Sequence, residues 1–95
     1  MKYEVVVILD PKSDEEKIDG VISRYEEYLN KNNGKFTSAE KWGKRDLQVQ
    51  FKKYDEVMEG HYVMIQFDDP KKNIAKLNYQ MKIDSDIIRH LVSKV

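Results

Sequence analysis

Apolar and polar residues alternate along four segments of this chain, and two further segments between them have apolar residues at helical spacing. The alternation typical of strands covers residues 2–9, 35–51, 61–67 and 87–94. The spacing typical of amphipathic helices covers residues 13–33 and 69–82. The pattern therefore predicts the element order β-α-β-β-α-β.

This order predicts an α+β domain of the ferredoxin-like, split βαβ type. Two β-α-β units that share one sheet give a four-stranded antiparallel sheet with both helices on one face. A length of 95 residues suits one domain, residues 1–95, with a real core and no separate catalytic domain. We expect function on the open face, meaning the sheet face that the helices leave free.

The first helix has clear start and stop signals. Asp10 and Pro11 end the first strand, and Ser13 with Glu16 three residues later forms a capping box. Gly34 is expected to end the helix. The buried stripe is predicted to contain Ile18, Val21, Ile22, Tyr25, Tyr28 and Leu29. We expect its two tyrosines in the core and not as a pair that stacks on a ligand.

Glycine and proline mark the later boundaries. Gly43 predicts a bulge or bend in the strand of residues 35–51. The polar residues 52–60 indicate a hairpin loop, with Gly60 in its turn. Asp69 followed by Pro70 predicts the start of the second helix.

Alternation also assigns side chains to the two faces of the sheet. In the third strand Val63, Ile65 and Phe67 are expected toward the helices, and Tyr62, Met64 and Gln66 on the open face. Leu91 of the last strand is expected on the helix side. The apolar residues of the open face are then predicted to be Val6, Ile8, Met64 and Val92, with His90 beside Val92.

Composition narrows the class of protein. Cysteine is absent, which excludes a disulfide framework, a thiolate metal site and a thiol nucleophile, and 36% of residues are charged. The longest apolar run, residues 5–9, is far shorter than the roughly 20 residues of a membrane helix. We therefore expect a cytoplasmic protein with no membrane partner and no targeting segment.

Charge is unevenly distributed although the formal net charge is zero. Residues 1–30 carry 4 basic and 8 acidic groups, residues 31–53 carry 7 and 2, and residues 54–95 carry 6 and 7. The basic middle consists of Lys31, Lys35, Lys41, Lys44, Arg45, Lys52 and Lys53. It fits either local neutralisation of phosphates or a solvated strand edge whose lysines block aggregation.

Catalytic chemistry has little material in this sequence. His61 and His90 stand alone, which argues against a metal site, and the four glycines form no phosphate-binding loop. Acylphosphatases share the expected fold and need an arginine in the loop after the first strand, where this chain has Lys12. We predict no enzyme activity, no metal and no cofactor.

Several segments together resemble one family, the sixth protein of the bacterial small ribosomal subunit. The resemblance rests on MKYE at residues 1–4, the Asp10-Pro11 turn, Gly34, WGKR at 42–45 with Leu47, GHY at 60–62 and IRHLV at 88–92. The chain departs from the usual pattern after Arg45, where residues 46–51 read DLQVQF, and at His61, where the family more often has tyrosine.

The resemblance implies a non-catalytic ribosomal protein with no small-molecule substrate. It implies pairing with the eighteenth small-subunit protein and binding to the central domain of the small-subunit RNA. A basic partner would supply much of the phosphate neutralisation, which suits a neutral chain. The candidate RNA contacts are Lys2, Tyr3, Arg45, Lys52, Lys53, Arg89 and His90.

These candidates differ in strength. A guanidinium can bind a phosphate bidentately and stack on a base, so Arg45 is the strongest. Tyr3 has the parity of a core residue whose hydroxyl reaches the rim. Lys2, Lys52 and Lys53 fit solvated lysines equally well.

Two other functions share the predicted fold. A regulatory module that binds a small molecule and dimerises through its sheet would also use apolar residues on the open face. An acylphosphatase-like enzyme is the other alternative. A stable homodimer in light scattering would favour the first, and a hydrolysis assay tests the second.

Overall fold

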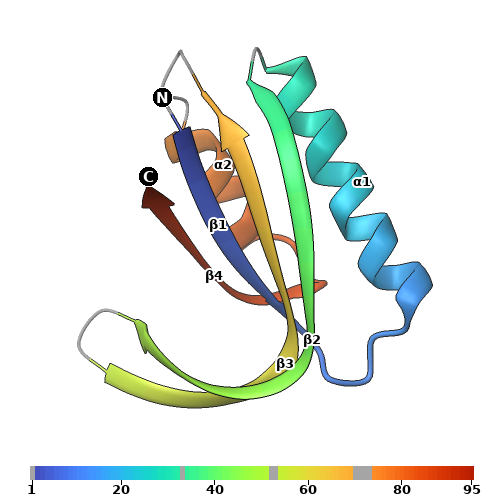
Figure 1. The fold of residues 1–95 in the computed structure, drawn as a ribbon, viewed down its shortest axis with the longest axis vertical. Coiled ribbons are helices and arrows are strands. Elements are labelled where there is room, and N and C mark those ends of the chain that lie inside the picture. The colour runs from blue at the N-terminus through green and yellow to red at the C-terminus, as the bar shows by residue number, and fades with distance from the viewer. Residues whose placement is uncertain (1, 33, 52–53, 70–73) are drawn as a thin grey trace.

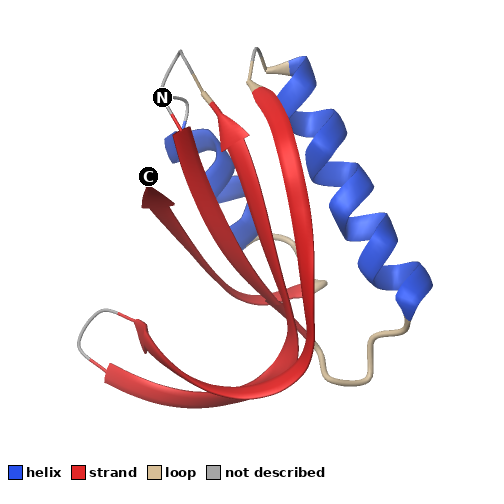
Figure 2. Cartoon of the chain, viewed as in Figure 1, coloured by secondary structure: helices blue, strands red, loops and turns tan. Residues whose placement is uncertain are grey.

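The computed structural model describes residues 2–32, 34–51, 54–69 and 74–95, and of residues 45–51 and 54–58 it describes the main chain. The elements are β1 (Lys2–Leu9), α1 (Glu15–Lys31), β2 (Lys35–Phe51), β3 (Tyr54–Asp68), α2 (Ile74–Lys82) and β4 (Ile87–Lys94). The four strands form an antiparallel sheet in the order β2-β3-β1-β4 (Figure 1). Both helices pack on one face of it (Figure 2), which confirms the ferredoxin-like prediction.

The core lies between this sheet face and the two helices. Val5, Val7 and Leu9 of the central strand β1 are fully buried. They share one cluster with Ile18, Val21, Tyr25 and Leu29 of α1, Val63, Ile65 and Phe67 of β3, and Leu77 and Met81 of α2. Burying one large aliphatic side chain stabilises a fold by about 1.5–3 kcal/mol, so this layer holds the helices on the sheet.

The first helix begins one residue later than the capping box predicted. The N-cap is Asp14, whose carboxylate accepts a hydrogen bond from the Lys17 N–H at 2.8 Å. Ser13 instead donates its N–H to the Asp10 carbonyl at 2.9 Å and closes the preceding turn. Aspartate caps as well as serine does and adds charge at the positive helix end, so the sequence DEE favours Asp14.

At its other end α1 stops where Gly34 predicts. The Gly34 N–H donates to the Leu29 carbonyl at 2.9 Å, a bond typical of helix ends. A Cβ at Gly34 would lie 3.2 Å from the carbonyl oxygens of both Leu29 and Asp68. A small residue is therefore needed where the chain turns from α1 into β2.

The predicted loop at residues 52–60 is wrong for most of its length. β3 begins at Tyr54, and the ladder between β2 and β3 continues to the pair Phe51 and Tyr54. This hairpin arm, residues 45–51 and 54–60, curves away from α1 (Figure 1). Lys52 and Lys53 lie outside the described residues. Main-chain pairing alone shows that this segment is a strand, because residues 54–60 (YDEVMEG) lack the alternation that identifies one in a sequence.

Two glycines shape the base of this arm. Gly43 has φ = 83° and lies at a register shift between Lys41 and Gly43, which confirms the predicted bulge. Gly60 is buried inside β3, not in a turn. A Cβ at Gly60 would lie 2.6 Å from the Leu9 carbonyl oxygen and 2.7 Å from the Ile8 Cγ2. The arm can therefore leave the sheet only with glycine at this position.

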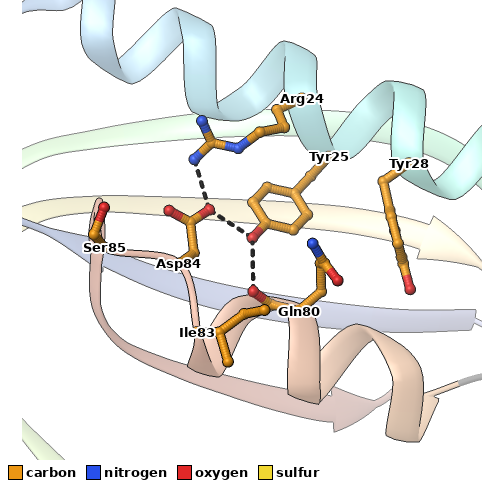
Figure 3. A pocket seen from close by; sticks show the side chains of 7 residues that line it. All are labelled: Arg24, Tyr25, Tyr28, Gln80, Ile83, Asp84 and Ser85. Carbon is orange, nitrogen blue, oxygen red and sulfur yellow. Dashed lines mark hydrogen bonds and ion pairs between the residues drawn. The ribbon is translucent and has the colours of Figure 1, made fainter.

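A polar cluster ties α1 to the turn between α2 and β4 (Figure 3). The Tyr25 hydroxyl donates to Asp84 Oδ2 at 2.7 Å, and the Arg24 guanidinium contacts the same oxygen at 2.6 Å. The other carboxylate oxygen of Asp84 accepts the Asp86 N–H at 3.0 Å. Arg24, Tyr25 and Asp84 line a cavity of about 310 Å³ together with Tyr28, Gln80, Ile83 and Ser85.

Mutual hydrogen bonding controls ionisation in this cluster. Burial by itself would raise the pKa of Asp84, but hydrogen bonds from Tyr25, the Asp86 main chain and Arg24 outweigh it and hold that pKa below its usual value. Burial and the bond to Asp84 raise the pKa of the Tyr25 hydroxyl, which stays protonated. The donors and acceptors of this cavity thus satisfy one another, which favours a structural role.

The cluster makes the stability of the protein depend on pH in the acid range. A carboxyl group whose pKa is lower in the folded than in the unfolded state contributes its full stabilisation above the unfolded pKa, about 3.9. That contribution is lost as the pH falls through the pKa of the folded state. We expect Asp84→Asn to lower the free energy of unfolding at pH 7 by about 1–3 kcal/mol, with the deficit shrinking below pH ~3. Urea unfolding at both pH values measures this.

The control is Asp19→Asn, which removes an exposed ion pair with Lys41 and should change stability little. An Asp84→Asn variant as stable as the parent at pH 7 would contradict the role of the cluster. So would a deficit that is unchanged in acid.

The contacts of Gly60 generate a second prediction. Gly60→Ala should lower the free energy of unfolding by about 1–3 kcal/mol, because the methyl group must displace main-chain atoms of β1. The matched control is Gly20→Ala on the exposed side of α1, where no atom lies within 4 Å of the new methyl group. That change should stabilise the protein by about 0.5–1 kcal/mol. Equal effects of the two changes would refute the close approach at Gly60.

Candidate nucleic-acid interface

The open face is built from residues that alternate with the core residues of β1. Lys2, Glu4, Val6 and Ile8 point to this side because Tyr3, Val5, Val7 and Leu9 belong to the core cluster. Residues directly opposite each other in an antiparallel ladder share a face. The registers of β3 and β4 on β1 therefore place Asp68, Gln66, Met64, Tyr62, Ser93, Leu91 and Arg89 on the open face.

An apolar row crosses the middle of this face. Val6 of β1 lies opposite Met64 on one side and Leu91 on the other. Val6 and Met64 are half-buried, and Leu91 is 44% exposed at the sheet edge. In the next row Ile8 and Tyr62 are buried. The face thus offers a hydrophobic strip whose outer end is accessible.

One end of the open face is basic. Lys2 lies opposite Asp68, and Asp68 lies opposite Lys35, so the three side chains form one row across β1, β3 and β2. Both lysines are exposed. The row places two ammonium groups around a single carboxylate, and this arrangement can receive a phosphate backbone.

The predicted arginines lie away from that end. Arg89 is exposed on the open face opposite Ile8, and its guanidinium donates to the Ile88 carbonyl at 3.3 Å. Arg45 lies opposite Gly60, where the hairpin arm leaves the sheet. Lys2 and Ile8 are six residues apart on β1, so Lys2 and Arg89 are separated by about 20 Å along the face. The candidates therefore form an extended surface and not one pocket.

Tyr3 and His90 lie on the helix side of the sheet. Tyr3 is 9% exposed and stacks on Phe67 with ring centroids 5.6 Å apart, as its parity predicts. His90 lies opposite Val7 and its Nε2 is 3.1 Å from Oδ1 of Asn78 in α2. Burial lowers the pKa of His90, which favours the neutral ring. Neither side chain points toward the open face.

The facing assignment predicted for β4 is wrong. Leu91 lies on the open face, and His90 and Val92 lie on the helix side, where Val92 packs against the core. Apolar residues occupy both parities of this strand, so alternation could not choose between them. A bulge between Ile8 and Leu9 also shifts the register of β1 on β4.

Three lysines of the basic middle form ion pairs with acidic residues of the same chain. Lys31 pairs with Glu27 at 3.0 Å, Lys44 with Glu59 at 3.8 Å, and Lys41 with Glu15 at 2.8 Å and with Asp19. These pairs are exposed and therefore weak, which favours the interpretation of solvated edge lysines. Lys41 also lies on the helix side, opposite Val63.

Two features of this face have no direct signal in the sequence. Alternation places Leu91, the exposed end of the apolar row, on the wrong side of the sheet, and the basic row of Lys2 and Lys35 depends on a pairing between distant strands. Gly60 was the available signal for the arm, since an isolated glycine within a strand indicates close approach of another main chain.

Other kinds of site find no support in the residues that the structure describes. Among them, no group of three or more histidine, cysteine or acidic side chains could hold a metal ion. No helix in the described part of the chain is long and apolar enough to cross a membrane.

The chain is similar to known proteins along nearly its whole length. The family model described as ribosomal protein S6 matches residues 2–94. The small ribosomal subunit protein bS6 of Heliobacterium modesticaldum is 36% identical over 91 residues, which cover 96% of this chain and 92% of that protein. The bS6 protein of Desulforamulus reducens is 34% identical over 90 residues, covering 95% and 92%.

A solved structure agrees in fold. The crystal structure of the 30S ribosomal protein S6 from Thermotoga maritima matches with a TM-score of 0.79 and 25% identity, over 99% of this chain and 86% of that one. Proteins of this family are non-enzymatic, cytoplasmic components of the small ribosomal subunit, which confirms the predicted class and location. The match along nearly the whole length assigns the chain to the ribosomal protein S6 family.

Proposed function

We propose that this protein binds the central domain of the small-subunit ribosomal RNA together with the eighteenth small-subunit protein. Membership of the S6 family supports the ribosomal role. The observation that carries the proposal is a sheet face free of helices, on which exposed basic residues flank an apolar row. Proteins recognise RNA at irregular junctions through its backbone, its 2′-hydroxyls and stacking on its bases. An extended surface with a few basic residues suits this kind of recognition.

Within this proposal the RNA contacts come from basic residues of the open face and of the hairpin arm. Lys2 and Arg89 lie on the open face, and Arg45 stands at the base of the hairpin arm. Lys52 and Lys53 belong to the proposal on the sequence alone. The burial of Tyr3 and the inward position of His90 support a positioning role for these two residues, which are the sequence neighbours of Lys2 and Arg89.

The apolar row supports the second part of the proposal. A protein partner can bury Val6, Met64 and Leu91, whereas RNA offers little apolar surface to a flat aliphatic strip. A basic partner would also supply the charge that this neutral chain lacks. The pair would then bind RNA with a composite surface.

Filter binding of the reconstituted pair to central-domain RNA tests the contacts. Arg89→Ala and Arg45→Ala should each weaken binding by about tenfold, and each should make the slope of log affinity against log salt less negative by about 1. The physical reason is the loss of one phosphate neutralised per arginine.

The matched control is Lys76→Ala, which removes an exposed positive charge from α2 on the other side of the sheet. Its affinity and its salt slope should equal those of the parent protein. If Lys76→Ala weakens binding as much as the arginine changes do, the open face is not the RNA surface. Unchanged binding by both arginine variants would also reject the assignment.

A further inference from the structure

Gly43 lies at a bulge that changes the pairing of β2 with β3. Lys41 pairs with Val63 and Gly43 pairs with Tyr62, so Trp42 is an extra residue in β2. Gly43 has φ = 83°, a conformation that residues other than glycine rarely adopt. No described atom lies within 4 Å of the place where a Cβ would stand. Glycine is therefore required here by the main-chain conformation of the bulge and not by lack of space.

The residues of the arm that follow the bulge divide into two sets. Tyr62 lies on the open face, and Gly60, two residues before it in β3, lies on the same side of the ladder. The β2 residue opposite Gly60, and every second residue after it, therefore shares the side of the open face. In the observed register this set is Arg45, Leu47, Val49 and Phe51. It contains one arginine and three apolar residues.

Without the bulge, β2 would place the other set on that side. The register set by Lys41 and Val63 would continue along the arm, and Lys44 would then lie opposite Gly60. A slip of one residue exchanges the two faces of a strand. The set on the side of the open face would become Lys44, Asp46, Gln48 and Gln50. The bulge thus selects the largely apolar set of the arm over a wholly polar one.

Described contacts at the base of the arm agree with the observed register. Lys44 and Glu59 form an ion pair at 3.8 Å, and the register places both on the side away from the open face. On the open face, Ile8 and Tyr62 are buried although they lie outside the core cluster of the helix side. A Cβ at Gly60 would lie 2.7 Å from Cγ2 of this isoleucine. The arm therefore leaves the sheet from a packed base.

We infer that Gly43 is a positioning residue of the interface. Its left-handed conformation holds the bulge, and the bulge places Arg45 and the apolar set of the arm on the side of the open face. The inference rests on the proposed function, because it makes the arm part of the same interface. In this register the arm adds one basic and three apolar positions to the side that carries the row of Val6, Met64 and Leu91.

Disulfide formation within the arm measures its register without RNA. The chain has no cysteine, and Asp46→Cys with Glu59→Cys places two thiols opposite each other within disulfide reach. Mild oxidation should link them in the parent and in Gly43→Asn, because asparagine tolerates the left-handed conformation. In Gly43→Val the yield should fall at least about fivefold, because a β-branched residue disfavours the bulge and the slip puts the two thiols on opposite faces.

The complementary pair is Arg45→Cys with Glu59→Cys, whose residues face each other only in the register without the bulge. This pair should link in Gly43→Val and much less in the parent and in Gly43→Asn. Equal yields of the first pair in Gly43→Val and in the parent would overturn the inference. A loss in Gly43→Asn as large as in Gly43→Val would overturn it too, because the left-handed conformation would then not be the cause.

Filter binding of the reconstituted pair connects the register to the interface. Arg45→Ala should weaken RNA binding about tenfold in the parent and in Gly43→Asn, but less than about twofold in Gly43→Val. Arg89→Ala should keep its full effect in all three proteins. A full effect of Arg45→Ala in Gly43→Val would contradict the inference. If neither arginine change affects binding in the parent, the proposed function fails, and the cross-linking result still decides the role of Gly43.

Discussion

Packing of both helices against one side of the central strand β1 is the constraint on which the other features depend. Val5, Val7 and Leu9 are completely buried between β1 and the helices, and their alternation fixes the outward direction of the residues between them. A shift of the register by one residue would exchange the two faces. The core therefore determines which side chains remain available for partners.

The open face divides into regions of different chemistry because each row combines residues from three or four strands. The row of Lys2, Asp68 and Lys35 is charged, the row of Val6, Met64 and Leu91 is apolar, and Arg89 adds a charge at the edge. An extended surface of this kind suits a macromolecule better than a small ligand. The cavity near Asp84, by contrast, lies on the helix side, and its polar groups are occupied with one another.

The sequence was sufficient for the element order and the facing of β1 and β3, because both rest on local alternation and on strong apolar stripes. It also located the bulge at Gly43. Prediction from the sequence failed where the local pattern of apolar and polar residues did not favour one structure. Residues 54–60 show no alternation of apolar and polar types, although their main chain pairs with β2 as a strand. The parity of β4 was ambiguous because Ile87, Ile88, Leu91 and Val92 occupy both faces.

The candidate surface was less predictable than the fold for a related reason. Single basic residues such as Lys2 and Arg89 were identifiable as candidates, but their neighbours come from other strands and follow from the register alone. The lysines of the basic middle lie on different faces of the folded protein. Lys41 lies on the helix side and pairs with Glu15 of α1, whereas Lys35 lies on the open face. Linear charge clusters therefore described the surface poorly.

Lysine-reactive footprinting tests whether the face without helices is the interaction surface, by comparing the protein alone with its mixture with the two proposed partners, central-domain RNA and the eighteenth small-subunit protein. Lys2 and Lys35 on the open face should be protected in the mixture, with Lys76 and Lys82 of α2 as reactive as in the free protein. Protection of the α2 lysines with continued reactivity of Lys2 and Lys35 would contradict this assignment.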